Sequence, residues 1–147
     1  MSRRLKTISR ISQLIEHRRE VLELEALQVQ KQLNRERSLL VTLKDQVQDS
    51  ISTFEEGLRD HRVLDSQEVS TLYEVSHFLF AKIERKDEEV AGIGRDLEVR
   101  RAVLLEAYKK EKVFGLFMGK MDFQEKREEA LKEQKSLDYL NLVKRSR

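Results

Sequence analysis

The sequence has no proline, no cysteine and no tryptophan in 147 residues, and it has only five glycines. Proline removes a backbone hydrogen bond and ends helices, so its absence leaves long helices uninterrupted. Without cysteine the chain can form neither a disulfide nor a thiolate metal site. Only 39% of the residues are hydrophobic, which is little for a thick globular core. These absences favour long, narrow helical packing and exclude a disulfide-stabilised fold.

Charge is abundant instead, at 38% of the residues, but 29 Lys and Arg nearly balance 27 Asp and Glu. The two signs alternate along the chain, as they do on solvent-facing helices, whereas a nucleic-acid-binding protein usually has one basic face. We therefore expect no nucleic-acid partner. The first twenty residues are an exception, with six basic residues against two acidic ones, so the amino end is basic.

No segment is apolar over the roughly 20 residues that a membrane-spanning helix needs. The longest apolar cluster, Val113–Met118, is short and contains Gly115, and the charged first ten residues lack the apolar centre of a signal peptide. We expect a cytoplasmic protein.

Apolar residues recur at steps of three, four and seven along both halves of the chain, which predicts one buried face on each of two coiled-coil helices. The first stripe consists of Ile8, Ile11, Ile15, Leu22, Ala26, Val29, Leu33, Leu40, Leu43, Val47, Ile51, Phe54 and Leu58. The second stripe consists of Leu72, Leu79, Ile83, Val90, Ile93, Leu97, Leu104, Ala107, Phe114, Met118 and Met121. Arg18 and Glu36 fall on the first stripe, where they either extend to solvent or set the register.

The stripe is lost around residues 57–67, and the run Asp65-Ser66-Gln67-Glu68 is typical of a helix start. Asp65 or Ser66 would be the N-cap, with Glu68 completing a capping box. We predict an all-α fold, an antiparallel two-helix coiled-coil hairpin with a C-terminal helical overhang, as a single domain over residues 1–147. Helix one would span about 3–60, the turn about 60–66 and helix two about 67–143.

The overhang follows from the position of the turn, because a fold near residue 63 places Ile8 opposite Met118 and leaves residues 124–147 unpaired. That segment would extend about 36 Å at 1.5 Å per residue. Its apolar stripe is thin and consists of Leu131, Leu137, Leu140 and Val143. We expect this segment to fray when free and to become ordered when bound.

The densest apolar cluster is residues 113–123, where Phe114, Met118 and Met121 lie on the stripe while Leu116, Phe117 and Phe123 point elsewhere. Either the amino-terminal residues Leu5, Ile8 and Ile11 cover this cluster, or it is a partner-facing patch.

A second cluster, residues 73–83, has Leu79 and Ile83 on the stripe, with Phe78 and Phe80 on opposite sides of it. At least one of these two rings should be exposed. The cluster either widens the core or forms a docking site.

No catalytic or phosphate-binding motif occurs. The three histidines are scattered, and Gly92-x-Gly94 lacks the third glycine of a phosphate loop. A narrow coiled coil cannot bury a carboxylate to tune its pKa for catalysis. We therefore expect no enzymatic activity, no cofactor and no metal.

The carboxyl end, residues 128–147, resembles that of the FliJ family of flagellar export proteins, most closely in the tract Lys132–Asp138 followed by a basic tail. Residues 73–83 resemble the second helix of the family. The resemblance implies a stalk protein that binds the hexameric export ATPase FliI, approaches the export gate FlhA with its turn end and escorts export chaperones. It would lie at the cytoplasmic face of the inner membrane and reach the membrane only through its partners.

Stalk proteins of injectisome type III secretion share this plan, and a dimeric structural coiled-coil adaptor is a further alternative. Under the resemblance, ATPase binding is assigned to the basic and apolar residues near the two chain ends: Arg3, Arg4, Ile8, Ile11, Phe114, Phe117, Met118, Met121 and Phe123. Export-gate binding is assigned to residues on both sides of the turn: Phe54, Tyr73, Phe78, Leu79, Lys82 and Ile83.

Overall fold

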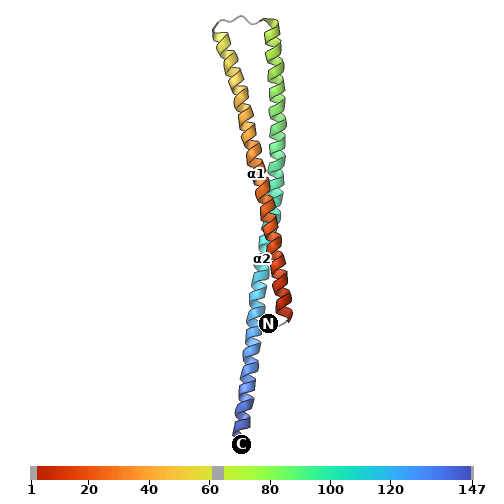
Figure 1. Cartoon of the computed structure of the whole chain (residues 1–147), viewed down its shortest axis with the longest axis vertical. Helices are drawn as coiled ribbons and strands as arrows, with labels where there is room; N and C mark the ends of the chain where they lie inside the picture. Colours follow the sequence, from red (N-terminus) through yellow and green to blue (C-terminus); the bar gives the residue numbers. More distant parts are fainter. Residues whose placement is uncertain (1–2, 61–64, 147) are drawn as a thin grey trace. The chain divides into compact units, whose positions relative to one another are not determined.

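The computed structural model describes residues 3–60 and 65–146, and the described residues form two α-helices and no strand. Helix α1 spans Arg3–Arg59 and helix α2 spans Ser66–Arg145 (Figure 1). The two helices pack against each other, so the predicted all-α helical hairpin is confirmed. Most of the predicted turn, residues 61–64, lies outside the described residues, as does Arg147 at the end of the basic tail.

Helix α2 begins with the predicted cap. The backbone N–H of Glu68 donates a hydrogen bond of 2.7 Å to Oδ1 of Asp65. Asp65 is therefore the N-cap, since it satisfies an amide that has no partner inside the helix. The helix ends with two basic residues, Lys144 and Arg145, which suit the negative end of the helix dipole.

The contacts divide the chain into two units, each containing part of both helices. Unit 1 combines Met1–Glu23 with Val103–Arg147, and unit 2 is the continuous segment Leu24–Ala102.

Unit 2 contains the best-packed part of the core. Leu33, which is only 2% exposed, packs with Val29 from α1 and with Leu97 from α2. Val90 and Ile93 are packed against this cluster and are partly buried. Burial of these apolar side chains is the main stabilising contribution in this unit.

Two ion pairs in unit 2 show the antiparallel order, since α1 numbers rise as α2 numbers fall. Arg100 Nη1 lies 3.3 Å from Glu25 Oε2, and Lys86 pairs with Glu36 eleven residues further along α1. Glu36 lies on the apolar stripe, and its side chain pairs with Lys86 of α2 instead of extending to solvent. The hydrogen bond and charge of Glu36 raise the pKa of Lys86 above its ordinary value, against the lowering effect of burial.

In unit 1, Ile8 and Leu22 are the buried residues of α1. Arg19 spans the two helices: its Nε donates to Glu111 Oε2 at 2.7 Å, and its guanidinium lies 5.5 Å from the centre of the Tyr108 ring. The hydrogen bond to Glu111 is the main cause that raises the pKa of Arg19, against burial, which lowers it. This arginine is therefore firmly charged and connects α1 to α2.

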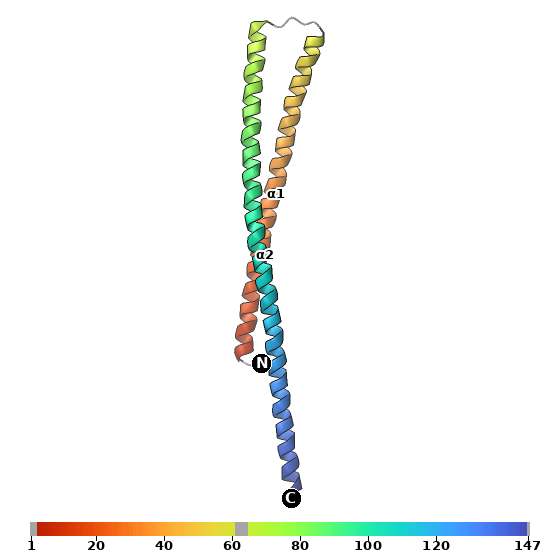
Figure 2. The ribbon, with the colours of Figure 1, turned by 180° about the vertical axis from the view of Figure 1, so that it is seen from behind.

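The predicted first stripe is buried along most of α1, whereas α2 has Leu97 as its buried residue and otherwise half-buried stripe residues. Ile11 and Leu58 differ from the prediction, because both are exposed. Ile11 lines a groove of about 410 Å³ whose opposite side includes the small Ala107. Leu58 is the second-last residue of α1, and α1 and α2 diverge toward this end of α1 (Figures 1 and 2).

Candidate partner-binding surfaces

The first surface, here called the Phe117 surface, consists of Leu116, Phe117 and Phe123 on α2 in unit 1. All three side chains are exposed, Phe117 by 47% and Phe123 by 66%. The Phe117 ring lies 5.9 Å from the Phe114 ring, centre to centre and tilted by 45°. The surface is thus apolar, and its Phe117 ring packs against the half-buried Phe114 ring.

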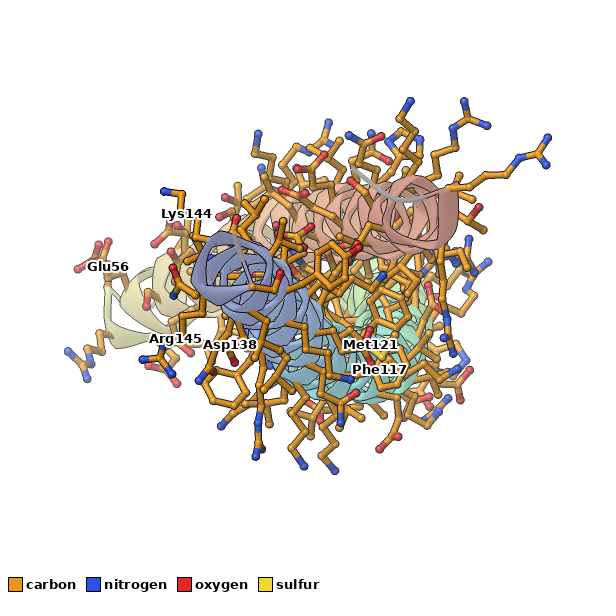
Figure 3. The ribbon with its side chains drawn as sticks, turned by 90° about the horizontal axis from the view of Figure 1, so that it is seen from below. Glu56, Phe117, Met121, Asp138, Lys144 and Arg145 are labelled. Atoms are coloured by element: carbon orange, nitrogen blue, oxygen red, sulfur yellow. The ribbon has the colours of Figure 1, made fainter. Side chains whose placement is uncertain are left out.

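Neither interpretation of this cluster holds for all of its residues. Phe114, Met118 and Met121 are half-buried, and Ile8 of the amino-terminal segment is buried. The Phe117 surface, however, stays uncovered. Phe117 and Met121 are one helical turn apart, and both are seen in the view along α2 in Figure 3. The amino-terminal segment therefore covers only part of the cluster, and the remainder is available to a partner.

The basic amino end lies in the same unit. Arg3, Arg4 and Arg10 are exposed and form no ion pair with any described residue. The first turn of α1 contains no acidic residue. Positive charge at a helix amino terminus opposes the helix dipole, so Arg3 and Arg4 in the first turn do not stabilise α1. They form an unpaired basic surface in unit 1.

The C-terminal part of α2 remains helical to Arg145, and its side chains are almost all exposed. Leu131, Leu137, Leu140 and Leu142 are each at least half exposed. The ion pair between Lys126 and Asp122, at 3.2 Å, joins residues of the same helix. The overhang is present as a helix, and its fraying in the free protein stays a prediction.

The second surface lies near the turn, in unit 2. Phe78 and Phe80 are 59% and 51% exposed, so the expectation that at least one would be exposed is confirmed for both. Their rings therefore do not widen the core. Tyr73 is 75% exposed, and its ring is stacked on that of His77 with 5° between the ring planes.

The other residues assigned to the gate surface are mixed in exposure: Lys82 is exposed, and Phe54, Leu79 and Ile83 are half-buried. Two adjoining grooves open between α1 and α2 beside them. One has a volume of about 270 Å³ and the other of about 560 Å³, and both are lined by Ser50, Phe54 and Leu72. The stripe did not predict these grooves, because regular spacing implies that the helices stay in contact up to the turn. Leu72 was therefore not assigned to a site.

Within residues 3–60 and 65–146, no three His, Cys, Asp or Glu side chains are grouped so that they could hold a metal ion. Neither helix, over its described length, has a window long and apolar enough to cross a membrane.

An all-α, coiled-coil-type hairpin with exposed aromatic and basic surfaces is the architecture of a structural or adaptor-type protein. The family model described as "Flagellar FliJ protein" matches residues 2–145. The chain belongs to the FliJ family and is a flagellar export-associated protein. Comparisons with curated proteins and with solved structures give no match.

Proposed function

We propose that the chain is the stalk protein of a flagellar type III export apparatus. In this role unit 1 binds the hexameric export ATPase, the turn end of unit 2 binds the export gate, and the protein escorts export chaperones. The family match, which covers nearly the whole chain, supports the flagellar system over the injectisome alternative. The protein would act at the cytoplasmic face of the inner membrane and would reach the membrane only through these partners.

The observation that carries the ATPase assignment is the combination of an apolar and a basic surface in unit 1. The Phe117 surface exposes two phenylalanine rings, and Arg3 and Arg4 lie unpaired in the first turns of α1. Aromatic residues, phenylalanine included, and arginine are enriched at protein–protein interfaces relative to the rest of the surface. The remaining residues assigned to this contact are Ile8, Ile11, Phe114, Met118 and Met121. Ile11 is exposed and would add to the apolar surface, and the other four would support these side chains from the helix–helix contact.

The gate assignment is supported by a second aromatic surface, in unit 2. Tyr73 and Phe78 expose most of their rings, and Lys82 adds an exposed charge. Phe54, Leu79 and Ile83 are half-buried beside them and would shape the floor of this contact.

The test is to measure ATP hydrolysis and hexamer formation by the purified export ATPase with and without this protein. The full chain should raise both. A variant ending at residue 123 should lose the stimulation and should keep the helical circular dichroism of the remaining hairpin. No change with the full chain would contradict the ATPase part of the proposal. Sedimentation velocity tests the adaptor alternative, because a stalk should be a monomer and the adaptor an obligate dimer.

A further inference from the structure

The two adjoining grooves at the turn end of unit 2 form one apolar surface that no described residue covers. We call it the turn groove, and its apolar lining is Val47, Ile51, Phe54, Val69, Leu72, Val75 and Leu79. Its rim is polar and includes Thr53 and Thr71. From Gln67 to Leu79 the groove follows α2 for about 18 Å at 1.5 Å per residue, which is the length of a helix of roughly 12 residues.

The segments that form the turn groove are strongly acidic. Residues 45–60 and 65–80 contain eight Asp and Glu against one Arg, in a chain whose formal net charge is +2. Asp49, Glu56 and Glu74 are exposed, and none of them forms an ion pair with another described residue. An unneutralised acidic surface around an apolar groove attracts a cationic partner and repels nucleic acids and anionic membranes.

We propose that the turn groove binds a short basic amphipathic helix of a partner protein. The apolar face of that helix packs on Phe54, Leu72 and Leu79, in the way that helix-in-groove recognition reads apolar residues at i, i+3 and i+7. Its Lys and Arg side chains lie along the flanks and reach the carboxylates of α1 and α2. A third helix there covers the apolar surface that two helices leave open.

A second copy of this chain is the less suitable occupant. Its exposed helical segment, residues 124–145, has six basic and five acidic residues, so it offers almost no net charge to an acidic groove. The proposal rests on the proposed function in one respect, because the turn groove shares Phe54, Tyr73 and Leu79 with the surface assigned to the export gate. It specifies what the gate, or another partner there, must present.

The experiment uses the full chain and three fluorescent peptides: a 14-residue amphipathic helix of Leu and Lys, the same helix with Glu for Lys, and residues 124–145 of this chain. Anisotropy titrations at low and at physiological salt give the affinities. We expect the Leu/Lys peptide to bind at least tenfold more tightly than either other peptide. Tighter binding of the 124–145 peptide, or equal binding of the Leu/Glu peptide, would overturn the proposal.

All four threonines of the chain are exposed helix residues, and they give a matched pair of variants. Thr53→Arg with Thr71→Arg places two cations at the groove, and Thr7→Arg with Thr42→Arg places two elsewhere. The first variant should weaken binding of the Leu/Lys peptide at least tenfold, and the second should weaken it by less than twofold. Equal weakening by both would show general charge attraction and refute the groove.

A second matched pair of variants removes negative charge without enlarging any side chain. The triple variant Asp49→Asn, Glu56→Gln, Glu74→Gln should weaken binding of the Leu/Lys peptide. The control triple variant Glu128→Gln, Glu129→Gln, Glu133→Gln should leave this binding unchanged. Because no export protein is present, failure of peptide binding refutes the groove and leaves ATPase stimulation to be judged separately. Conversely, the Thr53→Arg, Thr71→Arg variant should still stimulate the ATPase if the proposed function holds.

Discussion

Arg19 on α1 and Glu111 on α2 are joined by a hydrogen-bonded ion pair of 2.7 Å, with the Arg19 side chain only 17% exposed. The same guanidinium also pairs with Glu23 at 3.0 Å and lies over Tyr108. A planar guanidinium can make these contacts together, whereas a lysine ammonium cannot. The pair therefore connects the two helices of unit 1 at a defined register.

We expect Arg19→Ala to lower the urea midpoint of unfolding more than Arg19→Lys does. Lysine keeps the positive charge but lacks the planar guanidinium that makes the three contacts together. Circular dichroism at 222 nm measures both. The control is Arg10→Ala, since Arg10 is exposed and has no ion-pair partner among the described residues. Equal midpoints for Arg19→Ala and Arg10→Ala would contradict the role given to Arg19.

The core of unit 2 should be sensitive at Leu33. Leu33→Ala removes a side chain that is packed between Val29 and Leu97, and such truncations cost about 2–5 kcal/mol in buried sites. Leu24→Ala is the matched control, because Leu24 is exposed, and it should change stability by less than about 0.5 kcal/mol. Urea unfolding gives both values. Similar values for both variants would show that unit 2 lacks a localised core.

The Lys86–Glu36 pair predicts a loss of stability in alkali. The pKa of Lys86 is raised above its ordinary value of 10.5 in the folded chain, so the folded state holds the proton more tightly than the unfolded state. The stabilisation is complete below about pH 10.5 and is lost as the pH rises through the folded pKa. Lys86→Arg stays charged and should therefore lose less stability between pH 9 and pH 11.5.

The control for this pH effect is Lys109→Arg. Lys109 pairs with Glu106 on the same exposed helix face, and its side chain is 62% exposed. Thermal melts at both pH values should show a smaller difference for Lys86→Arg than for wild type, and an unchanged difference for Lys109→Arg. If all three proteins lose the same thermal stability between pH 9 and pH 11.5, then deprotonation of Lys86 does not cause that loss.

The two aromatic surfaces allow a reciprocal experiment. Phe117→Ser with Phe123→Ser should reduce stimulation of the export ATPase at least fivefold and leave binding to the export gate unchanged. Phe78→Ser with Phe80→Ser should do the reverse. All four rings are exposed, so neither pair opens a cavity, and both variants should keep the wild-type helix content. Each variant is the control for the other, and loss of both activities in either one would refute separate surfaces.

The two helices and most of their buried faces follow from the amino-acid sequence alone. Steps of three and four place Val29, Leu33 and Leu97 on inward faces because the period of an α-helix is fixed by its local backbone geometry. A cap at Asp65 or Ser66 was also predictable, since it depends on four consecutive residues, and the structure selects Asp65.

The contacts and openings between the two helices depend on how they pack, which neither segment specifies alone. The pairing of Glu36 with Lys86, the exposure of both Phe78 and Phe80, and the turn groove all depend on how closely α1 and α2 approach at each level. The distance between α1 and α2 at each level depends on the volumes of side chains from two segments far apart in sequence. The spacing of apolar residues within one segment therefore does not predict it. The periodicity marks which face turns inward, and the packing determines where that face is left open for a partner.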